Sequence, residues 1–471
     1  MKYSEVLTKR ARIKTQLQPH QLRALQKALN NNLILAHSTG SGKTLTSIAI
    51  ADAIGKPTTV LTPASLVSNY LKELRKHKAG GPSVQVISLP TAVKQKYTIP
   101  EGNTVILDEA HSLRNAGTAK QQYVKQQLAN AGRIIALTGT PGYNSVEDFA
   151  PLLNIVSRST LIPENSKDFR KKYIREVKTY PGLYARLVQG VKPGSTEYLR
   201  NEDELRARAS KYMDVFETDV EKPQRIDEVI EVPMDKAQEA VYRYVVKSIP
   251  ASMRYKVYNN IPPTKQEAAK LNAFLNAARQ VSNTPEAYQV SGSPGAKILA
   301  AVAKLEEQRK ADPNFRALVY SNYLDSGINS YAKQLDARGI PYSTFTGALT
   351  AKQKQDIVDK YNKGEIPIIL GSGSASEGLD LQGTKLVQIL EPHFNNAKTD
   401  QVIGRGIRYK SHNHLPEDQR KVLVQRFIST LAPTSSWYGR TAKINTSVDQ
   451  YLVSRALEKA KLIQQMKDAL S

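Results

Sequence analysis

Short runs of β-branched and aliphatic residues alternate with helix-like patterns, first over residues 1–160 and again over residues 295–430. The strand-like runs of the first stretch are 33–35, 59–61, 84–87, 104–107 and 133–137. Those of the second stretch are 318–320, 368–370, 386–390 and 422–424. Strands that alternate with helices are typical of a parallel sheet covered on both faces. The sequence therefore predicts an α/β protein with two parallel-sheet lobes in tandem.

The residues between these stretches differ in character. Residues 160–290 are rich in Lys, Arg and Tyr, show little strand pattern and are mostly helical by periodicity. Residues 447–471 form a last helical pattern. We therefore expect four parts, namely an N-terminal lobe (1–160), a helical, basic, Tyr-rich insertion (161–290), a C-terminal lobe (291–440) and a C-terminal helix (441–471).

The composition excludes several classes of protein. With 471 residues and no cysteine, the chain cannot form a disulfide framework, a Cys-ligated zinc site or a thiol nucleophile. The first residues show no apolar signal segment, and no apolar run approaches the roughly 20 residues that cross a bilayer. We therefore expect a soluble, cytoplasmic protein.

The charge balance favours a polyanionic partner. The chain carries 67 Lys and Arg against 43 Asp and Glu, a formal net charge of +24. Nucleic acid is favoured over an anionic membrane, because no long basic amphipathic helix with an apolar face is evident. A solubilising surface is the alternative interpretation of the charge alone.

A glycine-rich segment at residues 37–44, HSTGSGKT, links the first predicted strand to a helix. Its glycines let several backbone N–H groups point inward at a phosphate, and the helix N-terminus adds positive potential. Lys43 would reach the β- and γ-phosphates of ATP, and the Thr44 hydroxyl would ligate Mg²⁺. His37 departs from the strict pattern, which has a small residue there. The candidate ATP-binding residues of this loop are Ser38, Thr39, Gly40, Ser41, Gly42, Lys43 and Thr44.

Two more predicted strands end in polar residues. The strand at 104–107 leads into Asp108-Glu-Ala-His111, in which Asp108 would hold Mg²⁺ and Glu109 would deprotonate the attacking water. The strand at 133–137 leads into Thr138-Gly-Thr140-Pro, whose hydroxyls could sense the phosphates. Each segment alone could be an ordinary turn. At the same sheet edge as the glycine-rich loop, they favour a hydrolytic site.

The order of these three segments resembles motifs I, II and III of the superfamily-two helicases, and the form LTGTP at 137–141 resembles the Snf-type DNA translocases. The resemblance implies two RecA-like lobes with helical insertions and ATP hydrolysis with Mg²⁺. It also implies movement along DNA, which would be duplex or branched. Gln21 would read adenine. The residues implied to contact the nucleic-acid backbone are Pro63, Ser65, Ser321, Asn322, Thr346 and Gly347.

The second half resembles motifs V and VI of the same family, at 378–381 and 401–408. A forked, permanently charged guanidinium suits the departing γ-phosphate. Arg405 and Arg408, spaced by three, are expected on one face of a helix that projects into the cleft between the lobes. A surface salt-bridge face is the alternative. The resemblance assigns Gly378 and Asp380 to nucleotide binding, and His111, Thr138, Thr140 and Gln401 to coupling.

Segments that flank the second lobe extend the resemblance to Snf-type proteins. They are 235–242, 279–285 and 447–451. Residues 403–420 look closest to viral members, which include helicase-like ATPases of large DNA viruses and a phage branch-migration helicase. Nine tyrosines between Tyr173 and Tyr258 are interleaved with basic clusters. We hypothesise that residues 165–260 bind DNA, with a solvated helical face over packed Tyr rings as the alternative.

These features together predict an ATP-dependent DNA helicase or translocase that acts in replication, recombination or repair. One alternative is an RNA helicase or a transcription-associated viral nucleoside triphosphatase. Another is a basic nucleic-acid-binding protein with an inactive nucleotide site, which the complete set of ATPase residues disfavours. A packaging motor would need a further acidic cluster for its nuclease, and none is evident after residue 300.

Overall fold

The computed structural model describes residues 12–38, 40–115, 117–139, 146–216, 222–288, 293–376, 379–393, 396–408, 410–432 and 445–470. Contacts divide the chain into two compact units. The first consists of Met1–Arg175, Tyr198–Thr218 and Lys461–Ser471, and the second of Glu176–Glu197 and Asp219–Ala460. The sequence predicts four consecutive segments, whereas these two units are defined by contacts and combine separate segments. The four-part division therefore stays a prediction.

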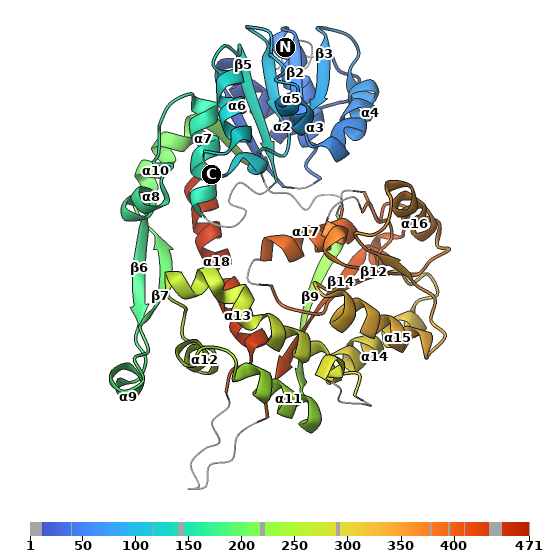
Figure 1. The fold of residues 1–471 in the computed structure, drawn as a ribbon. Helices are drawn as coiled ribbons and strands as arrows, with labels where there is room; N and C mark the ends of the chain where they lie inside the picture. Colours follow the sequence, from blue (N-terminus) through green and yellow to red (C-terminus); the bar gives the residue numbers. More distant parts are fainter. Residues whose placement is uncertain are drawn as a thin grey trace. The chain divides into compact units, whose positions relative to one another are not determined.

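Within the described residues, the first unit holds a six-stranded sheet in the order β3-β2-β4-β5-β1-β8, and all of its strand pairs are parallel (Figure 1). The strands are β1 (Leu33–His37), β2 (Thr58–Thr62), β3 (Val84–Ser88), β4 (Thr104–Leu107), β5 (Arg133–Thr138) and β8 (Met213–Phe216). The five strands predicted in the first stretch are confirmed. β8 comes from a distant part of the chain and extends the sheet beyond β1.

Helices cover both faces of this sheet because successive strand residues point to opposite faces. Leu33 and Leu35 of β1 pack in one apolar cluster with residues of α2 and α3, whereas Ile34 packs in another with residues of α5, α6 and α7. The helices of this unit include α2 (Pro19–Asn30), α3 (Lys43–Ile54), α4 (Val67–His77), α5 (Leu89–Lys94), α6 (Ala119–Leu128), α7 (Phe149–Ser157), α8 (Ser166–Tyr173) and α10 (Glu202–Ala209).

The described residues of the second unit also form a six-stranded parallel sheet, in the order β11-β12-β10-β13-β14-β9. The strands are β9 (Gln224–Pro233), β10 (Ala317–Tyr320), β11 (Ser343–Phe345), β12 (Ile368–Gly371), β13 (Leu386–Ile389) and β14 (Lys421–Thr430). The helices include α11 (Lys236–Val246), α12 (Ala251–Tyr258), α13 (Lys265–Asn283), α14 (Ala296–Ala311), α15 (Ser330–Asp336), α16 (Ala351–Lys363) and α17 (Asn396–Gly406). The predicted fold class, two parallel-sheet lobes in tandem, is confirmed.

The middle of the chain contains more strand than its pattern predicts: the sequence indicates only a lone strand or linker at residues 229–232, which lie within β9. Among the described residues of 161–290 are β6 (Ile174–Thr179), β7 (Gly194–Leu199), β8 and β9. β6 and β7 pair with each other, and β8 and β9 each form the edge of a sheet. Most residues of β6 and β9 are exposed, so charged side chains interrupt the apolar alternation that identifies a strand.

The last helix belongs to both units. α18 (Val448–Leu470) begins in the second unit, where Val448, Tyr451 and Leu452 join its helical apolar cluster. Its final turns belong to the first unit, where Leu462 and Met466 join the apolar cluster that contains Ile34 of β1. In the part of the chain that the structure describes, no helix combines the length and apolarity needed to cross a bilayer.

Candidate active site

Three of the predicted segments follow the C-terminal ends of neighbouring strands in the first unit. Asp108 comes directly after β4, Thr138 is the last residue of β5, and Ser38 follows β1. β5 lies between β4 and β1, so these residues share one sheet edge, as the sequence predicts. Thr39 and Thr140 lie outside the described residues.

The glycine-rich loop depends on two residues in the left-handed region. Gly40 has a φ of 83° and Gly42 a φ of 78°, and Gly42 is the N-cap of α3. The positive φ of Gly42 favours glycine there, and a Cβ would lie 2.6 Å from the Nε2 atom of Gln21, so the Gln21 side chain would have to shift. The chain thereby wraps tightly in front of the helix N-terminus, the conformation expected of a phosphate-binding loop.

The polar groups of the loop fit a triphosphate. The Lys43 ammonium donates to the carbonyl oxygens of His37 and Ser38, at 2.9 Å and 3.1 Å. The buried Ser41 hydroxyl has no hydrogen-bond partner among the described residues. Thr44 follows in the first turn of α3. An orphaned hydroxyl, an ammonium held at the loop and a helix N-terminus together form the donor set that a phosphate takes.

The structure explains why His37 replaces a small residue. Its side chain is fully buried, and its Nε2 atom lies 2.7 Å from Oδ1 of Asp214 on β8. Arg23 of α2 donates to both carboxylate oxygens of Asp214 at 2.9 Å. Burial alone would raise the pKa of Asp214, but the hydrogen bonds from His37 and Arg23 outweigh it and hold that pKa below its usual value. Sequence reasoning missed Arg23 and Asp214, because 191 residues separate them.

A stacked aromatic pair supports the other side of the loop. The rings of His20 and Phe216 are parallel within 6° with centroids 3.8 Å apart, and Nε2 of His20 lies 2.9 Å from the Ser41 carbonyl oxygen. Burial lowers the pKa of His20. Because a carbonyl oxygen can only accept, Nε2 donates in this hydrogen bond. Gln21, the predicted adenine reader, is buried, and its Nε2 lies 3.5 Å and 3.4 Å from the carbonyl oxygens of Ser41 and Gly42.

Asp108 is held as a buried acceptor. The Thr62 hydroxyl donates to its Oδ2 at 2.8 Å, and the backbone N–H of Glu109 donates to its Oδ1 at 3.0 Å. Burial and the adjacent Glu109 charge raise the pKa of Asp108, against the opposing effect of Lys43. A divalent cation would reverse this unfavourable balance, so Asp108 and the Thr44 hydroxyl fit the Mg²⁺ site that the sequence predicts.

Glu109 is placed by an unusual backbone conformation. Its φ is 48°, in the left-handed region, and it precedes a 3₁₀ turn at Ala110–Leu113. Oε2 of Glu109 lies 3.1 Å from Nδ1 of His111. Non-glycine residues in this region concentrate at functional sites. The predicted general base and the predicted coupling residue are therefore neighbours at the end of β4.

One expectation for the second unit is wrong. Arg405 and Arg408 do not share a helix face, because α17 ends at Gly406 and Arg408 lies beyond it. The spacing of three indicated a helix, but glycine has a low helix propensity and is common where helices end. The two guanidinium groups are therefore carried by different local structures.

The other motif residues of this unit lie around the end of α17. Nη1 of Arg408 donates to Oδ1 of Asp380 at 3.1 Å, so two predicted site residues form an ion pair. Gln401 lies on α17, and Gly378 lies outside the described residues. The roles of these residues at the γ-phosphate stay predictions.

The two predicted backbone-contacting residues that follow β10, Ser321 and Asn322, both contact a buried acid. Glu391 is fully buried and accepts from the Ser321 hydroxyl at 2.5 Å and from the Asn322 backbone N–H at 2.9 Å. The Ser321 side chain is also fully buried, so Asn322 presents the accessible side chain of this segment. Pro63 and Ser65 follow β2, and Thr346 and Gly347 follow β11, so all of these residues lie past C-terminal strand ends.

The segments that resemble Snf-type signatures meet in a buried polar network. Lys297 and Asp449, both fully buried, form an ion pair at 2.5 Å, and Lys297 also donates to Oδ1 of Asn283 at 3.1 Å. Nε2 of Gln238 donates to the carbonyl oxygens of residues 281 and 282 at 2.8 Å and 3.1 Å. Arg279 donates to the Pro392 carbonyl oxygen at 3.0 Å. Sequence reasoning found these segments but missed Lys297, which lies on α14.

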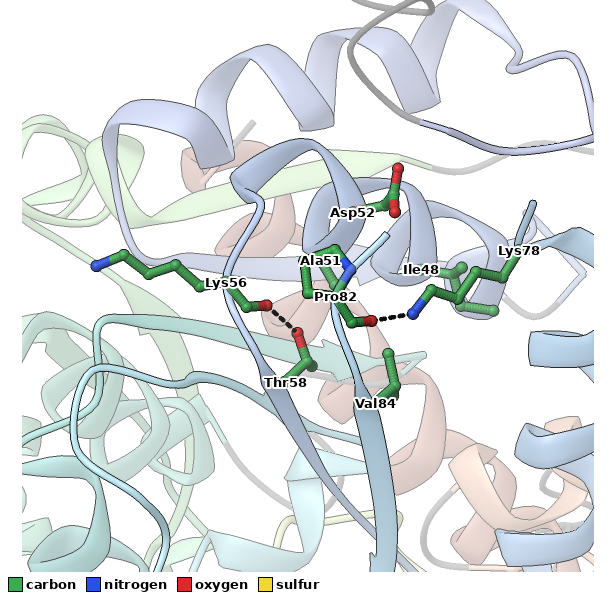
Figure 2. A pocket seen from close by; sticks show the side chains of 8 residues that line it. All are labelled: Ile48, Ala51, Asp52, Lys56, Thr58, Lys78, Pro82 and Val84. Atoms are coloured by element: carbon green, nitrogen blue, oxygen red, sulfur yellow. Dashed lines mark hydrogen bonds between the residues drawn. The ribbon is translucent and has the colours of Figure 1, made fainter. Parts of the chain in front are cut away.

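A pocket in the first unit lies away from the candidate site. Its cavity volume is about 10 Å³, roughly the space that one water molecule needs, so it is too small for a small-molecule ligand. Figure 2 shows its lining and two hydrogen bonds, from the Thr58 hydroxyl to the Lys56 carbonyl and from Lys78 to the Pro82 carbonyl. The lining residues are Ile48, Ala51, Asp52, Lys56, Thr58, Lys78, Pro82 and Val84. Thr58 and Val84 begin their strands, so this is the edge opposite the glycine-rich loop.

Comparisons with known proteins agree with this arrangement. Residues 83–287 match the SNF2-related domain, and residues 298–410 match the helicase conserved C-terminal domain. The chain is 32% identical over 467 residues to "Putative ATP-dependent RNA helicase L538" of Acanthamoeba polyphaga mimivirus, covering 95% of this chain and 94% of that protein. It is 24% identical over 551 residues to "Termination factor NPH-I homolog" of African swine fever virus, covering 93% and 75%.

A solved structure shows the same fold. The crystal structure of the Pyrococcus furiosus Hef helicase domain matches with a TM-score of 0.50 and 16% sequence identity, over 88% of this chain and 95% of that chain. This likeness shows that the two sheets have the fold of tandem RecA-like lobes.

Proposed function

Because the chain belongs to the Snf-type branch of the superfamily-two helicases, a family of ATPases, we propose that it hydrolyses ATP to move along duplex or branched DNA. The observation that carries the ATPase activity is the shared edge of β4, β5 and β1. That edge brings the glycine-rich loop and the Asp108–Glu109 pair to the same side of one sheet.

Each step of ATP hydrolysis can be assigned to residues of the first unit. The loop amides, Lys43 and the orphaned Ser41 hydroxyl bind the phosphates. Thr44 and Asp108 would hold Mg²⁺, which would supply positive charge next to the phosphates. Glu109, set apart from Asp108 by its left-handed backbone, orients the attacking water and accepts its proton.

DNA is the favoured track. The LTGTP form of the third motif and the segments of the buried polar network are of Snf type. The match to the SNF2-related domain supports the same choice. The net charge of +24 suits any nucleic acid and does not separate the two kinds. We propose that the activity serves replication, recombination or repair.

A second candidate function is favoured by the relatives. One is named as an RNA helicase and the other as a termination factor homologue. An RNA-dependent or transcription-associated ATPase would use the same nucleotide site, so only the nucleic acid that stimulates turnover separates the two functions.

The test measures ATP turnover by the wild type without nucleic acid and with single-stranded DNA, duplex DNA, a four-way junction and RNA. Glu109→Gln should abolish the stimulated turnover, because an amide cannot accept the proton. Glu101→Gln, an exposed carboxylate of the same unit, is the matched control and should behave as the wild type. Stimulation by RNA alone would establish the second candidate. Turnover that ignores every nucleic acid would refute both.

A further inference from the structure

An arm of the chain concentrates exposed apolar side chains. We define the arm as residues 174–199, in which β6 and β7 pair and α9 (Leu183–Leu187) lies at the far end of the strand pair (Figure 1). Among the described residues, fourteen large apolar side chains are exposed, and seven of them belong to the arm. The arm therefore presents a much denser apolar surface than the rest of the described chain.

Five of these side chains gather around α9, and we call them the apolar tip. They are Tyr180 (58% exposed), Leu183 (67%), Tyr184 (67%), Leu187 (70%) and Val188 (65%). Scattered exposed apolar residues are ordinary on a soluble protein, but a contiguous group marks a surface that contacts something else. Two members are aromatic and the others are aliphatic, so the tip offers both flat rings and compact side chains.

The tip is held by a packed base. Ala185 and Val191 are buried, and the Val191 N–H donates to the Ala185 carbonyl oxygen at 3.0 Å. Gly194 packs so closely that a Cβ there would lie 1.9 Å from the Pro262 carbonyl oxygen. Lys265 of α13 pairs with Glu176 at 2.8 Å. The contacts with Pro262 and Lys265 hold residues 176–197 within the second unit, while the tip side chains remain exposed.

The charges of the arm identify the partner. It carries four basic residues, Arg175, Lys178, Arg186 and Lys192, against Glu176 and Glu197. The Arg186 guanidinium lies 5.6 Å from the Tyr180 ring centroid. Basic side chains among exposed Tyr rings suit unpaired or terminal bases next to phosphates. Aliphatic side chains are also the residues that proteins insert as wedges between base steps.

We propose that the apolar tip is the element that separates strands when this protein meets the junction of a branched or forked DNA. Leu183, Tyr184 and Leu187 contact the terminal base pair at the junction, and the flanking basic residues hold the departing phosphates. This inference rests on the proposed function, because only a motor that pulls DNA past the arm would convert such a contact into strand separation.

The experiment compares three activities of the full-length protein. They are DNA-stimulated ATP turnover, displacement of a third strand from a triplex, and separation of a forked duplex. The test variant is Leu183→Ser/Tyr184→Ser/Leu187→Ser. Leu299→Ser/Leu457→Ser is the matched control, since these residues are exposed and apolar but lie outside the arm. Tyr184→Phe keeps the ring and should retain separation.

The tip variant should separate forks about tenfold more slowly, the loss expected from one missing base-stacking contact. Its ATP turnover and triplex displacement should equal those of the wild type. Because the substituted residues are exposed, its thermal unfolding should also be unchanged.

Unchanged fork separation by the tip variant would overturn the inference and leave the tip as a protein-docking surface. An equal loss in triplex displacement would also overturn it, because the tip would then serve general DNA binding. A wild type that displaces triplex strands but separates no fork refutes the inference and leaves the proposed function standing. A wild type that DNA does not stimulate refutes the proposed function itself.

Discussion

The imidazole of His37 and the carboxylate of Asp214 are hydrogen-bonded inside the first lobe, although 177 residues separate them in the chain. The bond joins the strand that precedes the phosphate loop to β8, the last strand of its sheet. The loop therefore depends on a segment that arrives from beyond the middle of the sequence.

The Asp214→Asn substitution should lower the free energy of unfolding by about 2 kcal/mol at pH 7, because it weakens the buried hydrogen bonds of His37 and Arg23. The folded pKa of Asp214 lies below its usual value, so its charge stabilises the fold above about pH 4. This contribution is lost as the pH falls through the lower folded pKa. Urea unfolding at pH 7 and pH 3.5 measures it, and a difference of equal size at both values would contradict the explanation.

The Asp108→Asn substitution should have the opposite effect on stability. Burial and the Glu109 charge raise the pKa of Asp108, so its ionised form costs stability above the unfolded pKa. The free energy of unfolding of the ligand-free variant should be about 1 kcal/mol higher than that of the wild type at pH 7, and this difference should shrink toward pH 4. ATP turnover should be lost. A variant less stable than the wild type at pH 7 would show that the hydrogen bonds of Asp108 outweigh its charge.

The Lys297–Asp449 pair should be strongly coupled. Removing one partner leaves a buried charge, so Asp449→Ala should destabilise the second lobe by about 3–5 kcal/mol. The double variant Lys297→Met/Asp449→Ala removes both charges and should recover a large part of that loss, and Lys297→Met is the second single variant. Denaturant unfolding of the two single variants and the double variant completes the cycle. Additive losses would mean that the two side chains act independently.

Two glycines flank α3, and substituting them distinguishes the effect of backbone strain from that of a side-chain contact. Gly42 and Gly55 have φ values of 78° and 75°, but only at Gly42 would a Cβ meet another residue, Gln21. Both alanine variants should lose about 1 kcal/mol of stability from the left-handed backbone. Gly42→Ala should also raise the KM for ATP severalfold, because it displaces Gln21 and the loop. An equal KM change in Gly55→Ala would show that strain alone is responsible.

The sequence predicted most strands of the two lobes and the sheet edge that carries the candidate site. The strands of the two lobes are short, apolar and followed by polar residues, so the positions of Lys43, Asp108 and Thr138 at one sheet edge follow from the sequence. The same reasoning missed β8, whose four residues join a sheet through pairing with β1 rather than through their own pattern. It also missed β11, which has three residues.

Other features depend on tertiary contacts, which the spacing of residues in the sequence does not reveal. Arg405 and Arg408 have helical spacing, but the end of α17 at Gly406 decides their environment. The Snf-type segments are recognisable as motifs, yet their shared burial around Lys297 follows only from the packing of α13, α14 and α18. Periodicity indicates which side chains share a face, whereas partners hundreds of residues apart are set by topology.

The chain passes from one unit to the other at residues 175/176, 197/198, 218/219 and 460/461. Neither unit is thus a continuous stretch of polypeptide, and no single cut in the gene can release one intact. A fragment that stops at residue 460 would deprive the first unit of Leu462 and Met466, which α18 contributes to its core. The polypeptide passes between the units four times, so each unit is built from segments that are continuous in sequence with the other.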